Sequence, residues 1–292
     1  MIGEMINSGL QYLSLLKEVP LRYLFLALLT YYLSVVVYAL RWKLVLRGMG
    51  KDAPLLELLK AILASIFMNN VTPTSRGGGE VLRIAWISKR KGIPLGISTT
   101  SVVYERILES IPVFALFLVG MFYFSQVPET AAFIVMALII AVWVKWDWFV
   151  KLSFKLFRKG ASEEEVERIA SLKDKHHITL GGIVLSSCVW ILDVVRLKLV
   201  TLAFGLHLGW RLLVVISVAN LILGLIAFTP GGIGIVEGGL VGVLIHFGIP
   251  MALAVPITLL ERFISYVMSS LVGFFVLVTS GGWGIWRALK SQ

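Results

Sequence analysis

The sequence predicts an all-α, polytopic membrane helical bundle built from two inverted repeats, each with a Pro/Gly-broken re-entrant helix hairpin. An apolar composition, long apolar segments and a repeated order of motifs predict this fold. Of the 292 residues, 58% are hydrophobic and 15% are charged, and the mean hydropathy is +0.89. A soluble chain covers its core with roughly 25% charged residues. Lipid must therefore surround most of this chain.

Several apolar segments reach the roughly 20 residues that a helix needs to cross a bilayer. The uninterrupted segments run over about 21–40, 94–124, 131–144, 179–201 and 250–280, and the interrupted ones run over 55–88 and 212–247. The polar stretch 145–177 predicts a connector with a surface helix near 163–168. The first span follows a mixed-charge start, which favours a signal anchor over a cleaved signal peptide.

Four short motifs occur in the same order, at nearly the same spacing, in each half of the chain. In the first half they are Arg41 to Val45 (RWKLV), Thr72-Pro73, Glu80 and Glu105-Arg106. In the second half they are Arg196 to Val200 (RLKLV), Thr229-Pro230, Glu237 and Glu261-Arg262. We therefore expect one transmembrane domain over 1–292. Residues 21–124 form repeat 1, 125–178 the extra span with a cytoplasmic connector, and 179–280 repeat 2.

The distribution of basic residues predicts how the halves are oriented. The loops expected at 41–51 and 89–91 are strongly basic, whereas the equivalent loops at 204–211 and 247–251 carry little charge. Basic loops lie on the cytoplasmic side. The first broken hairpin then enters from the cytoplasm and the second from outside, in a multi-pass protein of the cell membrane. The N-terminus is expected outside and the C-terminus inside. Inverted repeats that meet at broken helices recur in transporters.

Charged residues within the apolar segments mark the candidate site. An ionisable group at mid-bilayer costs about 2.5–3.5 kcal/mol on insertion scales, so it persists where it is paired or functional. Neighbouring residues on a helix do not face each other, so the Glu-Arg pairs need partners on other helices or in a cavity. The candidate substrate-binding residues are Arg41, Arg76, Glu80, Arg83, Glu105, Arg106, Asp193, Arg196, Glu237, Glu261 and Arg262.

Two interpretations of these charges remain open: interhelical salt bridges that only hold the bundle together, or a polar cavity lined from both halves. Arginine suits the second, because a guanidinium binds phosphate in bidentate fashion. The glycines at 77–79 and 231–232 allow close backbone approach, and the helix near Glu80 could direct N–H groups at an anion. The alternative for these glycines is a flexible turn without ligand contact. Asn69, Asn70 and Asn220 are weaker candidates that could bond the unwound backbone.

The broken segments and the Glu-Arg pairs resemble the transmembrane, flippase-type domain of the lysylphosphatidylglycerol synthase family. The resemblance rests on residues 70–83 (NVTPTSRGGGEVLR), 104–106 (YER), 229–238 (TPGGIGIVEG) and 260–262 (LER). It covers nearly the whole chain, as a stand-alone member. It implies translocation of a phospholipid or polyprenyl-linked lipid between leaflets. The chain shows no soluble aminoacyl-transferase domain, which argues against synthesis of a lysyl-lipid.

The leading functional hypothesis is a lipid flippase or scramblase that is not an enzyme. Its partners are membrane lipids with anionic phosphate head groups, and no nucleic acid is expected. The lack of a nucleotide-binding motif favours downhill or ion-coupled transport, for which glutamate protonation could supply coupling. Alternatives are a secondary transporter of a small polar or anionic solute and, ranked last, an intramembrane lipid-modifying transferase. A single cysteine and four histidines without ligand spacing indicate no metal site or cofactor.

Overall fold

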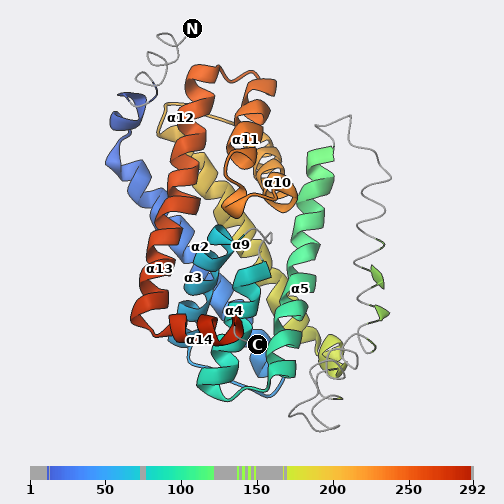
Figure 1. Cartoon of the computed structure of the whole chain (residues 1–292). Coiled ribbons are helices and arrows are strands. Elements are labelled where there is room, and N and C mark those ends of the chain that lie inside the picture. Colours follow the sequence, from blue (N-terminus) through green and yellow to red (C-terminus); the bar gives the residue numbers. More distant parts are fainter. Residues whose placement is uncertain are drawn as a thin grey trace.

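The computed structural model describes residues 14–72, 77–121 and 170–290, together with the single positions 12, 137, 140, 141, 144, 145, 148 and 167 (Figure 1). The predicted extra span, the surface helix near 163–168 and most of the connector therefore lie outside the described residues. Within the described ranges every regular element is helical. This agrees with the all-α bundle expected from the sequence.

The described elements alternate long helices with short, paired ones. In chain order they are α2 (Leu21–Gly48), α3 (Leu55–Val71), α4 (Gly77–Lys91), α5 (Leu95–Met121), the 3₁₀ turn η1 (Ser171–Asp174), α9 (His176–Leu202), α10 (Trp210–Ile226), the 3₁₀ turn η2 (Pro230–Gly232), α11 (Ile235–His246), α12 (Met251–Arg262), the π-helical segment η3 (Phe263–Met268), α13 (Ser269–Thr279) and α14 (Gly282–Lys290).

Three of these helices are long and apolar enough, by length and composition, to cross a membrane. They are α2, α9 and the continuous helix α12–η3–α13 over Met251–Thr279. Large apolar side chains such as Phe25, Leu180 and Phe275 are more than 60% exposed on their surfaces. Such exposure is unfavourable in water but expected where lipid is the solvent. The protein is thus a multi-pass membrane protein.

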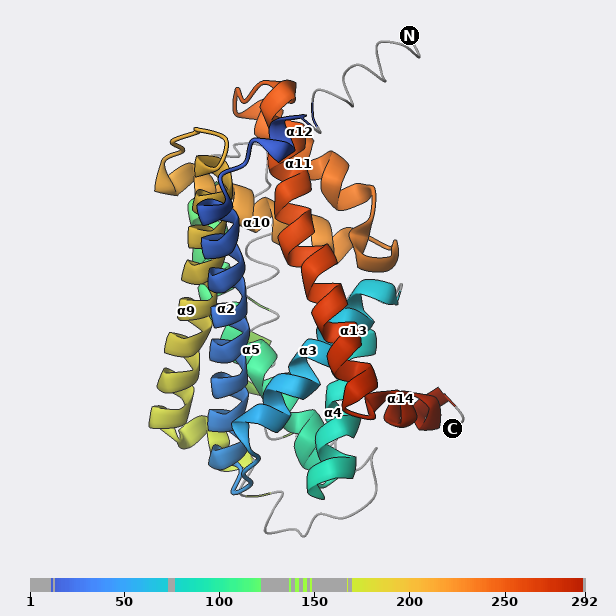
Figure 2. The same ribbon diagram turned by 90° about the vertical axis from the view of Figure 1, so that its left-hand side faces the viewer.

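The long helices α2 and α9 pack against each other and run antiparallel along the molecule (Figure 2). The pair α3–α4 lies toward one end of the bundle, and the pair α10–α11 lies toward the other. Helix α3 packs on α13, and α10 packs on α5. The interrupted ends of the two pairs meet at mid-height, where a Cβ added to Gly231 would lie 2.9 Å from the carbonyl oxygen of Asn70.

One expected boundary was wrong. Residues 41–51 do not form a loop, because α2 continues to Gly48 and the connection to α3 covers only 49–54. The helix ends where Gly50 adopts a φ of 74° and Lys51 donates its N–H to the carbonyl of Leu46, a termination that glycine permits. After the last long helix the chain continues in α14, whose Gly282 packs against Trp86.

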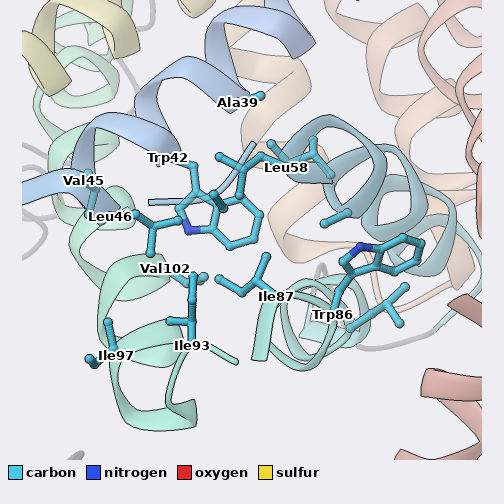
Figure 3. Packing of buried hydrophobic residues seen from close by; sticks show 14 of the residues in the cluster. Ala39, Trp42, Val45, Leu46, Leu58, Trp86, Ile87, Ile93, Ile97 and Val102 are labelled. Carbon is cyan, nitrogen blue, oxygen red and sulfur yellow. The ribbon is translucent and has the colours of Figure 1, made fainter. Parts of the chain in front are cut away.

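Helices α2, α3, α4 and α5 share a tightly packed apolar core at one end of the bundle, to which Ile178, Leu277 and Ile285 also belong (Figure 3). Trp42, one of its two tryptophans, is fully buried and donates its indole N–H to Ser101 Oγ at 3.0 Å. Other side chains in this core are Leu46, Leu58, Trp86, Ile87 and Val102. A second core joins α9, α10, α11 and α12 through residues such as Leu213 and Ile257. The described part of the bundle thus has two cores, and each includes residues from both halves of the chain.

The contact of α13 with α3 depends on Gly273. A Cβ at this position would lie 2.4 Å from the carbonyl oxygen of Leu63 and 2.8 Å from Phe67 Cβ. Small residues allow such backbone approach between membrane helices. We predict that Gly273→Ala lowers stability by about 1–3 kcal/mol, measured as a lower thermal midpoint in detergent. Gly242, in α11, has open space around it, so Gly242→Ala serves as the control. Equal midpoints for both variants would contradict this packing.

Candidate functional site

A network of six charged side chains, hereafter the first-half network, lies within α2, α4 and α5. At its centre is Glu105, which is fully buried. Its Oε1 accepts from Arg41 Nε at 3.2 Å, and its Oε2 accepts from Arg83 Nη1 at 2.6 Å. Because α2 supplies Arg41 and α4 supplies Arg83, one carboxylate joins three helices.

The other two carboxylates of this network close it around Arg106. Glu80 accepts from Arg83 Nε at 2.5 Å and from Arg106 Nη2. Glu109 accepts from Arg41 Nη2 at 3.2 Å and from Arg106 Nη1 at 2.6 Å. Three arginines therefore face three glutamates, and the first-half network is neutral when all six are ionised. The ring of Tyr38 stacks beneath Arg41, at 4.5 Å from the guanidinium carbon to the ring centroid.

A smaller group, hereafter the second-half triad, consists of Asp193, Arg196 and Glu261. One nitrogen, Arg196 Nη2, donates to Asp193 Oδ1 at 2.6 Å and to Glu261 Oε1 at 2.9 Å. The second oxygen of each carboxylate accepts a hydrogen bond from a serine hydroxyl. Asp193 Oδ2 accepts from Ser217 at 2.5 Å, and Glu261 Oε2 accepts from Ser265 at 3.1 Å. One arginine thus serves two carboxylates, and the ionised triad carries one negative charge.

Arg262 and Glu237 secure the second broken segment. Arg262 donates from Nε to Glu237 Oε1 at 2.6 Å and from Nη2 to the carbonyl of Gly231 at 2.7 Å. The other oxygen of Glu237 accepts the N–H of Gly234 at 2.6 Å. Glycines 231, 232 and 234 all have positive φ, a conformation open to glycine at little cost. Side chains thereby satisfy non-helical backbone that lipid could not.

Two asparagines lie beside the first break, and one of them bonds backbone next to it. Asn69 Oδ1 accepts the N–H of Gly79 at 2.8 Å, at the start of α4. Asn70 Nδ2 donates to Ser270 Oγ at 2.8 Å on α13. The expected use of these asparagines to bond the interrupted backbone is therefore confirmed for Asn69. The amides of Gly79 and Gly234 are bonded within the chain, so these two donors do not support an anion site at the helix starts.

A cavity of about 320 Å³ lies where the two halves meet. Its wall is mostly polar and comes from both halves of the chain. The lining includes Tyr31, Tyr38, Ser65, Asn69, Asn70, Thr72, Glu80, Arg106, Glu109, Trp190, Asp193, Arg196, Ser217, Asn220, Gly224, Thr229, Gly231, Arg262 and Ser265. A polar cavity lined from both halves, one of the two interpretations of the charged residues, is therefore present in the structure.

The structure brings together ten of the eleven candidate residues. Five line the cavity: Glu80, Arg106, Asp193, Arg196 and Arg262. Behind them, as their hydrogen-bond partners or in the same network, lie Arg41, Arg83, Glu105, Glu237 and Glu261. The eleventh, Arg76, lies outside the described residues. The salt bridges and the cavity are thus both present, and the same side chains form both.

Among the side chains of the site that the sequence interpretation missed are Glu109, Tyr38 and Trp190. Glu109 stands one turn after Arg106 in α5 and pairs with it. Tyr38 stands one turn before Arg41, and its hydroxyl accepts from Arg106 Nη2 at 2.6 Å. Their i, i+3 spacing from the arginines could have identified both. Trp190 carried no such signal.

A second, apolar hollow of about 630 Å³, hereafter the groove, lies between α5, α9 and α10. Its wall is formed by Ile111, Pro112, Ala115, Leu116, Ile183, Ser187, Trp190, Ile191, Val194, Val195, Trp210 and Val214. Of the described residues, Trp190 alone lines both the groove and the cavity. In the part of the chain that the structure describes, no three acidic, histidine or cysteine side chains gather to hold a metal ion.

Removing the central carboxylate tests whether the buried charges stabilise the bundle. Glu105→Gln leaves Arg41 and Arg83 buried without their shared anion, so we predict a loss of about 3–5 kcal/mol, measured by thermal unfolding in detergent. The control is Asp52→Asn. A hydrogen bond from Arg47 lowers the pKa of exposed Asp52, so this variant also removes an ion pair at neutral pH. Exposed pairs contribute little, and a control effect as large as that of Glu105→Gln would contradict the prediction.

The family profile described as "Lysylphosphatidylglycerol synthase TM region" matches residues 10–273. A UPF0104 membrane protein of Pyrococcus horikoshii is 25% identical over 295 residues, with 89% of this chain and 88% of the relative covered. A UPF0104 membrane protein of Methanocaldococcus jannaschii is 25% identical over 282 residues, covering 88% and 84%. The names of these two relatives state no activity. Because the profile covers most of the chain, this protein belongs to the lysylphosphatidylglycerol synthase transmembrane-region family.

Proposed function

We propose that this protein moves a phospholipid or polyprenyl-linked lipid between the two leaflets of a cell membrane. The observation that carries the proposal is that a charged cavity and an apolar groove adjoin at Trp190. A membrane lipid has a polar head and an apolar tail that need these two environments at once. A small polar solute would need only the cavity. A lipid substrate is therefore favoured over the solute.

The groove suits an acyl or prenyl chain. Its wall is almost entirely apolar, with Ser187 as the single hydroxyl-bearing residue. On its rim Ile191 is 61% and Trp210 58% exposed, so the groove opens toward the surrounding lipid. Burying each methylene group of a chain there contributes about 0.8 kcal/mol if the alternative is water. A lipid tail in a bilayer is surrounded by other apolar chains rather than by water. Its movement into the groove therefore involves no large free-energy change.

The arginines that line the cavity are paired with carboxylates in the absence of substrate. A head-group phosphate must therefore exchange with, or share, an existing partner. Guanidinium groups bind phosphate and carboxylate with the same bidentate geometry, so such an exchange keeps the number of charge-assisted hydrogen bonds nearly constant. Binding can then be reversible, as transport requires.

We further propose that the two halves are inverted copies whose re-entrant hairpins are α3–α4 and α10–α11. Their positions toward opposite ends of the bundle support this, as do the corresponding contacts of α3 with α13 and α10 with α5. The ends of α2 and α9 also match. Gly50 and Gly205 both have positive φ, and Leu206 donates to Thr201 as Lys51 does to Leu46.

Inverted copies allow alternating access, because each half can adopt the conformation of the other. The loops at 49–54 and 92–94 lie at the same end as α14, and the loops at 203–209 and 247–250 lie at the other. From the basic residues near the first end we propose that it faces the cytoplasm. This leaves the N-terminus outside and the C-terminus inside. The charge pairs could exchange partners as the halves alternate.

Filling the cavity tests the proposal without removing a charge. Gly224 lines the cavity, and a Cβ there has open space around it. We predict that Gly224→Leu reduces exchange of a fluorescent phospholipid in proteoliposomes at least tenfold, because the added side chain occupies the head-group volume. The readout is the fraction of probe that dithionite bleaches with time. Thermal midpoints check that the fold is retained.

Gly242→Leu is the matched control, since Gly242 also has free space but does not line the cavity. It should exchange lipid like the unmodified protein. Release of entrapped glycerol phosphate, a tailless head group, is measured in parallel. Rapid release of glycerol phosphate without lipid exchange by the unmodified protein would contradict a lipid substrate and favour the solute transporter.

A further inference from the structure

Two buried N–H groups at the cavity wall have no acceptor within the chain. They are Trp190 Nε1 and Arg196 Nε, and both side chains line the cavity. Arg196 is 5% exposed. Buried donors in proteins are nearly always hydrogen-bonded, and an unpaired one is destabilising. Both side chains stand on α9, six residues apart, and a ligand in the cavity that they line could supply the missing acceptors.

The other two arginines that line the cavity, Arg106 and Arg262, have no buried nitrogen without a hydrogen-bond acceptor. Arg106 donates to Glu109, Tyr38 and Glu80, and Arg262 donates to Glu237 and Gly231. Among the described residues two further buried polar atoms lack partners, Arg83 Nη2 and Thr258 Oγ1. Neither of those residues lines the cavity. The free donors at the cavity are therefore confined to Trp190 and Arg196.

We propose that Trp190 and Arg196 form the subsite that binds the phosphate of the transported lipid; this rests on the proposed function and specifies its substrate contact. Phosphate oxygens accept hydrogen bonds from indole and guanidinium N–H groups alike. Trp190 also lines the groove. The phosphodiester of a phospholipid stands where the polar head joins the apolar tail. A subsite at the junction of cavity and groove therefore fits a lipid phosphate better than free phosphate.

The test is direct binding in a non-ionic detergent. The probe is dihexanoyl phosphatidylglycerol below its micelle concentration, and the method is isothermal titration calorimetry. We expect Trp190→Phe, which keeps the ring and removes the N–H, to weaken binding about tenfold, as expected for loss of a hydrogen bond to a charged group. Trp283→Phe is the control, because Trp283 of α14 lines neither the cavity nor the groove. It should change the affinity less than twofold.

A second probe separates the possible results. Inorganic phosphate should bind much more weakly than the lipid, and equal affinity would overturn the assignment to a lipid phosphate. Binding that Trp190→Phe leaves unchanged, or no binding at all, would overturn the subsite. Lipid exchange in proteoliposomes is a separate readout, so exchange that persists in Trp190→Phe keeps the proposed function without this subsite.

Discussion

Charges and broken backbone held away from bulk water are the constraint on which this structure depends. Each ionised side chain and each non-helical peptide group at membrane depth must find its partner within the protein. Glu105 is the hydrogen-bond partner of two arginines, and Arg262 donates to a carbonyl of the second broken segment. The broken helices can meet at mid-height because these side chains replace the water that a soluble protein would use. Their meeting point is also the cavity.

The two halves use this constraint differently. The first-half network is balanced, with three arginines and three glutamates bonded to one another, and its central members are buried. The second-half triad has one arginine for two carboxylates. A balanced network is suited to a rigid scaffold. An unbalanced one changes its interactions when an anion arrives, so we propose that the second half makes the contacts with the head group.

Much of the fold and the site could be predicted from the sequence. The helices expected at 55–71 and 179–201 agree with α3 and α9 within a few residues, because their apolar runs end at proline, glycine or charge. The charged residues could be identified because they are costly in an apolar helix. Arg41 was wrongly placed in a loop. A basic residue at the end of an apolar segment is typical of a cytoplasmic loop, and only the structure shows that Arg41 bonds to Glu105 within the bundle. Trp190 could not be identified from the sequence. A tryptophan among apolar residues has the same sequence pattern whether it packs in a core or lines both the cavity and the groove.

The opposed entry of the two hairpins is the central claim, and cysteine labelling tests it most directly. After Cys188→Ser, single cysteines replace Asp52 and Lys91, which flank α3–α4, or His207 and Met251, which flank α10–α11. A membrane-impermeant maleimide is then applied to intact cells and to permeabilised cells. The account predicts that positions 207 and 251 react in intact cells and that positions 52 and 91 react only after permeabilisation. Labelling of 52 and 91 from opposite sides, or of all four positions from one side, would contradict it.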